Sequence, residues 1–144
     1  MTLDGIRFLP PAGGDETFWR ILAAAVGDPT SEKMARVAAA YRDEPGRGLV
    51  EVTVEGVQVA AAGYRQDQEG VEITHIAVAP GRQNSGYGRA LINAISRAHP
   101  GLPIHAETHS GATGFYLRLG FAVEALPPKA GWAPRFRCLR IADI

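Results

Sequence analysis

Small and polar residues gather at one point of the chain, in the stretch Gln-Asn-Ser-Gly-Tyr-Gly at residues 83–88. Gly86 and Gly88 lack a Cβ, which permits positive φ angles and lets an anion approach the backbone, and Asn84 also tolerates the left-handed region. The stretch separates an apolar run from an amphipathic helix, so unpaired amides and the positive end of the helix dipole face it. An arginine on either side adds positive charge. The pattern predicts a site for a phosphate or pyrophosphate.

Two better-known phosphate-binding motifs do not fit this loop. A Walker loop needs Lys and then Ser or Thr where Tyr87 and Gly88 stand, which leaves no side chain for the terminal phosphates and Mg²⁺. A dinucleotide fingerprint needs a third glycine where Leu91 stands. From the loop alone, a glycine-rich connection that binds nothing stays open as the alternative.

The elements that must position the loop are read from the period of the apolar residues. We expect, in chain order, a strand ended by Pro10 and Pro11, helices with apolar stripes over 18–26 and 34–41, a hairpin of strands over 49–54 and 57–61, a strand over 71–78, a helix with its stripe over 91–95, a strand over 102–108, a helix over 111–119, and strands over 121–126 and 136–141. The unit over 71–108 should form a right-handed parallel crossover. The prediction is one mixed α/β domain over residues 1–144, with about seven strands and four helices in the order β-α-α-β-β-β-α-β-α-β-β.

Composition narrows the range of partners and compartments. Lys and Arg number 15 and Asp and Glu number 15, so no overall basic charge favours nucleic acid or an anionic membrane. The single cysteine, Cys138, cannot form an internal disulfide, and no apolar run approaches the roughly 20 residues of a membrane span. We expect a cytoplasmic protein with neither a nucleic-acid nor a membrane partner.

Two sequence blocks carry a resemblance to a known family. The first is Gln83-x-x-Gly86-x-Gly88 together with the strand before it, residues 72–80, and the second is the block over residues 112–121 with its Phe-Tyr pair. Both blocks, their separation and the order of elements resemble the GNAT N-acetyltransferase superfamily, over nearly all of residues 48–126. In that family a loop of the form R/Q-x-x-G-x-G/A follows the fourth strand and holds the pyrophosphate of acetyl-CoA through backbone amides.

The resemblance implies which residues bind acetyl-CoA. Main-chain groups of the fourth strand pair with the pantetheine arm, and the loop and helix start hold the phosphates. The implied set is Ile76, Ala77, Val78, Gln83, Asn84, Ser85, Gly86, Tyr87, Gly88, Arg89 and His109. The sequence departs from the family at Asn84, where a glycine is usual, and at His109, where many members have an asparagine.

Acetyl transfer also implies two proton movements. An amine with a pKa near 10.4 is about 0.04% neutral at pH 7, so a base must remove its proton. Glu72 resembles the fourth-strand glutamate that serves as a water-mediated base, and Glu107 on the next strand is the competitor. In a regular strand His75 points away from Glu72, so one of them at most faces the acceptor unless a bulge intervenes. Tyr116 is similar to the tyrosine that protonates the departing thiolate.

Two other constellations are weaker. His105, Glu107 and His109 share one face of a strand, but neighbours on a single strand match tetrahedral metal geometry poorly, and we expect no metal. Cys138 is expected to be a small buried strand residue.

The predicted function is therefore transfer of an acetyl group from acetyl-CoA to a primary amine, on a small molecule or a peptide, by direct transfer in a ternary complex. The alternative is a non-catalytic acyl-CoA-binding regulatory module. Dimers are common among proteins similar to this one, so a homodimer is a candidate assembly.

Overall fold

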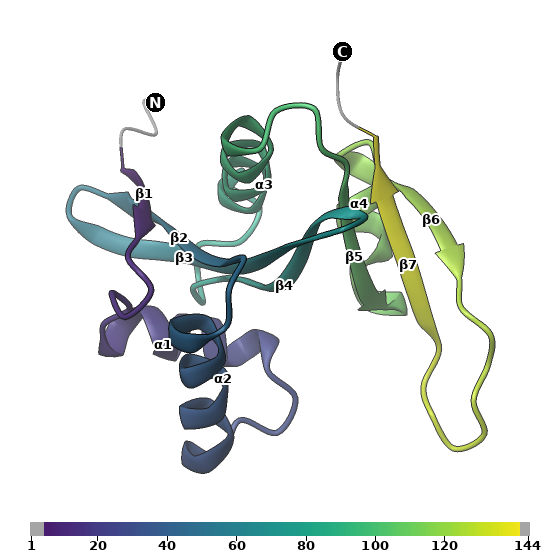
Figure 1. The fold of residues 1–144 in the computed structure, drawn as a ribbon, viewed down its shortest axis with the longest axis horizontal. Coiled ribbons are helices and arrows are strands. Elements are labelled where there is room, and N and C mark those ends of the chain that lie inside the picture. The colour runs from purple at the N-terminus through teal and green to yellow at the C-terminus, as the bar shows by residue number, and fades with distance from the viewer. Residues whose placement is uncertain (1–4, 142–144) are drawn as a thin grey trace.

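Residues 5–141, the part of the chain that the computed structural model describes, form a seven-stranded sheet with helices on both faces (Figure 1). The elements are β1 (Ile6–Leu9), α1 (Glu16–Leu22), the 3-10 helix η1 (Ala23–Ala25), α2 (Ser31–Asp43), β2 (Arg47–Val54), β3 (Val57–Asp67), β4 (Gly70–Val78), α3 (Tyr87–Ala98), β5 (Ile104–His109), the 3-10 helix η2 (Ser110–Ala112), α4 (Thr113–Arg118), β6 (Ala122–Ala125) and β7 (Arg135–Arg140). The predicted fold class and element order are confirmed.

The strands lie in the order β1-β2-β3-β4-β5-β7-β6. Every neighbouring pair is antiparallel except β4 and β5, which are parallel and joined through α3, as the strand–helix–strand pattern predicts. The exception matters because it falls in the middle of the sheet, beside the glycine-containing loop that follows β4.

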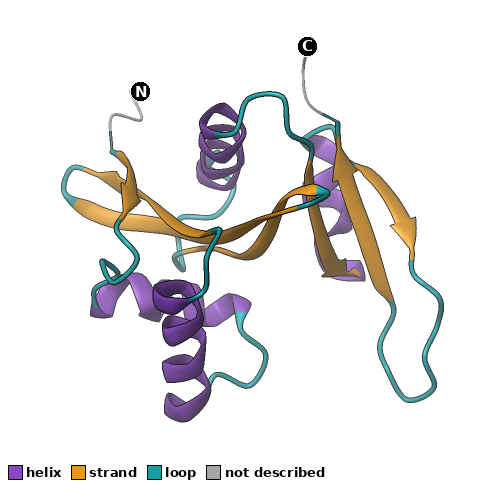
Figure 2. Ribbon diagram, viewed as in Figure 1, coloured by secondary structure: helices purple, strands orange, loops and turns teal. Residues whose placement is uncertain are grey.

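Two apolar cores hold the helices on the sheet. Leu91, Ile92 and Ile95 stripe one side of α3 and are buried on one face of the sheet, while Phe18 and Tyr41, from α1 and α2, are buried on the other. Figure 2 shows α3 on one side of the sheet and α1 and α2 on the opposite side. None of the helices within residues 5–141 is long and apolar enough to cross a membrane.

The structure corrects several element boundaries, and the largest change is in β3, which continues to Asp67 where the predicted strand ends at residue 61. The first helix ends at Leu22 and continues as the 3-10 turn η1, because its three alanines bury little apolar surface to hold another α-helical turn. The fifth strand begins at Ile104 and not at Leu102, since Pro103 has no amide and offers only its carbonyl to the Val71 amide. The fourth helix is divided into η2 and α4.

Candidate active site

The parallel strands β4 and β5 separate soon after they meet. Only Val71 with Ile104 and Glu72 with His105 are in register, although β4 continues to Val78 and β5 to His109. Beyond those two pairs the facing edges of the strands diverge (Figure 1). The sheet therefore contains a gap whose walls are two strand edges.

The free edge of β4 presents main-chain groups to this gap. The Ala79 amide donates to the Val59 carbonyl, and Ala77 is in register with Ala61 on β3. Bonded and non-bonded positions alternate along an antiparallel ladder, so the amides and carbonyls of Ile76 and Val78 point to the opposite edge, into the gap. These two residues are the ones from which strand addition is expected, whereas the Ala77 main chain faces β3.

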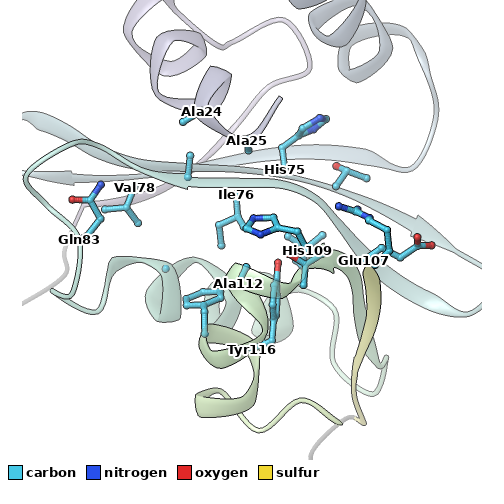
Figure 3. Close-up of a pocket in the computed structure, with 17 residues that line it drawn as sticks. Ala24, Ala25, His75, Ile76, Val78, Gln83, Glu107, His109, Ala112 and Tyr116 are labelled. Atoms are coloured by element: carbon cyan, nitrogen blue, oxygen red, sulfur yellow. The ribbon is translucent and has the colours of Figure 1, made fainter. Parts of the chain in front are cut away.

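A cavity of about 440 Å³ occupies the gap, within the usual range for small-molecule sites. We call it the main cavity. Its walls come from β4, β5, η1, α4 and the loop before α3, and the lining residues used below are His75, Ile76, Val78, Gln83, Gly88, Glu107, His109, Phe115, Tyr116 and Arg135. Figure 3 shows that side chains from both faces of the sheet reach this space.

A second depression, the phosphate depression, adjoins the main cavity at the start of α3. Arg82, Gln83, Asn84, Gly86, Tyr87, Gly88, Arg89 and Arg118 line it. Asn84 and Gly86 have φ angles of 64° and 83°, the left-handed conformation that the sequence predicts for this loop. The amides at the N-terminus of the twelve-residue helix α3 and three arginines give the depression the charge of an anion site.

Glycine at position 88 is required by packing as well as by the loop. A Cβ there would lie 2.8 Å from the Phe115 ring, so α3 and α4 approach each other only because this side chain is absent. Gln83 stabilises the turn before α3, because its side-chain oxygen accepts a hydrogen bond from the Gly81 amide at 3.1 Å. Ser85 is exposed in the same loop.

Tyr116 reaches the main cavity from α4. Its side chain rises towards His109 and Ile76 (Figure 3) and packs edge-on against Phe115 and Phe121 at ring separations of 5.0 and 5.2 Å. Tyr116 is 4% exposed, and burial raises its pKa to about 12, so the phenol keeps its proton at neutral pH. No side chain within residues 5–141 hydrogen-bonds the hydroxyl, which leaves the proton free for a ligand.

The two candidate carboxylates lie in different surroundings. Glu72 accepts a hydrogen bond from Arg65 at 2.6 Å and lines a neighbouring polar depression, not the main cavity. Glu107 lines the main cavity, the polar depression and an apolar hollow beside the loop over residues 126–134. It makes no salt bridge within the described part of the chain. Of the two carboxylates, the structure brings only Glu107 into the cavity with Tyr116.

Histidines of the fifth strand take separate partners. His105 lies 3.2 Å from the Asp67 carboxylate, and the His109 ring accepts a hydrogen bond from the Gly111 amide at 3.1 Å while lining the main cavity. No three or more ligand side chains within residues 5–141 are grouped as a metal site. Cys138 is fully buried, as its place in an apolar strand predicts, and burial raises the pKa of its thiol.

His75 lines the main cavity, although the sequence placed it at the acceptor only as an alternative to Glu72. The register of β3 and β4 shifts so that Gly63 faces His75 and Tyr64 faces Ile73, which makes Thr74 an extra residue, a β-bulge. The bulge puts Glu72 and His75 on the same face of the sheet. Figure 3 shows His75 on the opposite side of the sheet from Tyr116. Strand alternation allows Glu72 and His75 to share a face only if a bulge lies between them. No local residue pattern predicts where such a bulge occurs.

Comparison with known proteins identifies the family to which this fold and this loop belong. The family model described as an acetyltransferase (GNAT) domain matches residues 33–123, which is more than half of the chain. The chain belongs to the GNAT acetyltransferase family. Enzymes of this family use acetyl-CoA, so the predicted assignment as an acyltransferase is confirmed at the level of the family. None of the curated proteins matches the sequence.

Solved structures share the GNAT fold at low sequence identity. An acetyltransferase from Thermus thermophilus matches with a TM-score of 0.75 and 16% identity over 98% of this chain and 99% of that chain. The ribosomal-protein-S18-alanine N-acetyltransferase from Escherichia coli matches at 0.66 and 20%, over 96% and 95%. An aminoglycoside 6'-N-acetyltransferase complexed with coenzyme A matches at 0.68 and 16%, over 88% and 89%.

Proposed function

We propose that this GNAT protein transfers the acetyl group of acetyl-CoA to a primary amine in a ternary complex. The observation that carries the proposal is the gap between β4 and β5, which connects the phosphate depression to a cavity containing both a buried protonated phenol and a free carboxylate. The aminoglycoside and ribosomal-protein enzymes with the same fold are named for amine acceptors, which supports the choice of acceptor class.

The proposed binding of acetyl-CoA uses main-chain groups first. Amides at the start of α3, with Arg82, Arg89 and Arg118 around them, hold the pyrophosphate. The gap-facing amides and carbonyls of Ile76 and Val78 pair with the pantetheine arm as an added strand. Of these groups, the Val78 amide is the one that donates to the thioester oxygen at the end of the arm, which gains negative charge as the amine attacks.

The proposed chemistry divides the proton transfers between two residues. Glu107 attracts the ammonium form of the acceptor to the cavity, where a base of the cavity takes its proton. The amine nitrogen then bonds to the acetyl carbon, the carbon–sulfur bond breaks, and the Tyr116 hydroxyl protonates the sulfur. The proton that the nitrogen loses on becoming an amide returns through water to the Tyr116 phenolate. Glu72 has a less direct part in this scheme, because its carboxylate is paired with Arg65 and lines a neighbouring depression, not the main cavity.

Thiol release measured with and without amines tests the proposal. Purified protein with acetyl-CoA should bind the co-substrate by calorimetry and release free coenzyme A faster when amino acids, polyamines, peptide N-termini or aminoglycosides are added, with the acetylated amine found by mass spectrometry. Tight binding with no acceleration by any amine identifies the rival, a non-catalytic acyl-CoA-binding module. Absence of binding overturns both readings.

A further inference from the structure

Three elements converge on one buried hydroxyl beneath the main cavity. Tyr41 comes from α2, is 2% exposed, and packs against β3 and β4. A Cβ at Gly63 would overlap its phenol ring, so the glycine on β3 is what lets the ring lie on the sheet. The bulge at Thr74 then turns two consecutive residues of β4 towards the same hydroxyl. The cluster therefore depends on tertiary packing, because its residues come from three elements that are far apart in sequence.

The hydrogen bonds of this cluster constrain the imidazole. The Tyr41 hydroxyl lies 2.6 Å from Nδ1 of His75 and also contacts the Thr74 hydroxyl. Tyr41 has one proton to donate. If it donates to Thr74, it accepts from a protonated Nδ1, and the lone pair of the neutral ring is then on Nε2. If Thr74 donates to it instead, it donates to Nδ1 and the ring proton is on Nε2, so the tautomer distinguishes the two arrangements. No hydrogen-bond partner of Nε2 is found among residues 5–141, and His75 lines the main cavity.

The charged groups around His75 favour its neutral form. Burial lowers its pKa, and the nearby positive charges of Arg47 on β2 and Lys33 on α2 lower it further. Glu72 is the carboxylate on the same face of β4, and it is paired with Arg65. The wall from η1 contributes only alanines, Ala24 and Ala25. The imidazole is therefore uncharged at neutral pH and holds a lone pair for a proton.

We propose that His75 is the residue that takes the proton from the acceptor amine inside the main cavity, and that Tyr41 is a positioning residue that fixes the imidazole with its lone pair on Nε2. The inference rests on the proposed acetyl transfer and deepens it. The ammonium proton moves to Nε2, the nitrogen bonds to the acetyl carbon, and the carbon–sulfur bond breaks as the sulfur takes the Tyr116 proton. The second proton, which the nitrogen loses on becoming an amide, returns through water to the Tyr116 phenolate. His75 and Tyr116 thus act from opposite faces of the sheet (Figure 3).

The tautomer is tested without any turnover. Nitrogen-15 NMR of the uniformly labelled protein distinguishes a protonated Nδ1 from a protonated Nε2, and the His75 signals are assigned by their loss in His75→Gln. We expect a protonated Nδ1 at neutral pH in the wild type. A protonated Nε2 overturns the proposal, whatever the enzyme's activity. In Tyr41→Phe the preference for Nδ1 should weaken, and Gly63→Ala gives a second way to displace the phenol if that variant does not fold.

Kinetics then test the role. His75→Gln should lower kcat about 100-fold, the scale of a lost general base, and remove the acid limb of the pH profile of kcat/KM, while the Kd for coenzyme A changes less than twofold. His99→Gln is the matched control, because His99 is also half-buried with Nδ1 bonded, to the Ile95 carbonyl at 2.8 Å, but lies outside the cavity. Unchanged kcat in His75→Gln overturns the inference and leaves the acetyltransferase proposal standing, whereas wild-type protein that acetylates no amine overturns the proposed function.

Discussion

The two sides of the gap between β4 and β5 are built from different materials. On one side, which we call the cofactor side, the phosphate depression is formed by a glycine loop, the start of α3 and gap-facing main-chain groups of β4. On the other, the acceptor side, the surroundings are side chains from η1, β4, β5 and the loop over 126–134. The cofactor side consists mainly of glycines and main-chain groups. The acceptor side consists of side chains.

This difference explains what each side can tolerate. Amides recognise a diphosphate whatever residues carry them, provided that the backbone can adopt its left-handed turns. An acceptor pocket made of exposed side chains changes its preference with each substitution. The cofactor side should therefore respond to added atoms, and the acceptor side to removed ones.

The largest expected effect comes from Tyr116, which lines the main cavity where the two sides meet. Tyr116→Phe should lower kcat by about 10²- to 10³-fold, because a general acid contributes on that scale. The Kd for acetyl-CoA, measured by calorimetry, should change less than twofold, since the hydroxyl has no partner among the described residues. Equal turnover in the variant would remove Tyr116 from the mechanism.

Alkaline unfolding compares the two buried tyrosines directly. Burial raises the pKa of both Tyr41 and Tyr116 from 10 to about 12, so the folded protein holds these protons where the unfolded chain loses them. The stabilisation is complete below pH 10 and is lost as pH rises towards 12, by about 2–3 kcal/mol for each tyrosine. Urea unfolding at pH 8 to 11 should show a shallower loss in either Tyr→Phe variant.

The same measurement at pH 7 separates the two sides. Tyr41→Phe leaves Thr74 and His75 without their partner and should cost about 1–3 kcal/mol, whereas Tyr116→Phe removes a hydroxyl with no such partner and should cost far less. Equal losses at neutral pH would contradict the contrast between a bonded and an available phenol.

A third test adds one methyl group to the cofactor side. Gly88→Ala should weaken coenzyme A binding about tenfold, because the new Cβ meets the Phe115 ring and shifts the start of α3. Gly81→Ala is the control, since its Cβ would meet no atom within 4 Å, although its φ of 81° still strains the turn. Stronger loss of binding in Gly81→Ala than in Gly88→Ala would show that loop conformation matters more than the approach of α3 to α4.

The smallest expected effect lies on the acceptor side. Trp132 is 72% exposed at the apolar hollow that Glu107 also lines, so Trp132→Ala should raise KM for an apolar amine about threefold and leave kcat unchanged. The Kd for coenzyme A serves as the internal control. A change in that Kd without any change in KM would place Trp132 on the cofactor side.

Most of the fold and the cofactor side could be predicted from sequence, for a physical reason. Alternating valines, capped helices and glycines at positive φ are local features, and the loop over 83–88 contains nearly everything that its chemistry requires. The helix that ends at Leu22 departs from prediction only because an alanine run keeps the helical period without much surface to bury.

The acceptor side could not be predicted because tertiary contacts decide it. The bulge at Thr74 reverses the direction of His75, and the hydroxyl that holds it is 34 residues away on α2. The resemblance makes Glu72 the first candidate and Glu107 its competitor, yet an arginine on β3 engages the first and leaves the second free. Residue type indicates which groups can react, whereas the packing of α2 and β3 decides which of them meet.

The pairing of β4 with β5 is short, because only two residue pairs connect these strands in the middle of the seven-stranded sheet. The ladder between β1–β4 and β5–β7 consists of Val71 with Ile104 and Glu72 with His105, so the two halves are fastened at one end only. A ligand that lies along β4 in the gap would contact both halves of the sheet. At a concentration a hundredfold above its Kd, it adds about 2.7 kcal/mol to the free energy of unfolding. The resistance of the molecule to proteases should then rise and fall with the supply of its acyl donor.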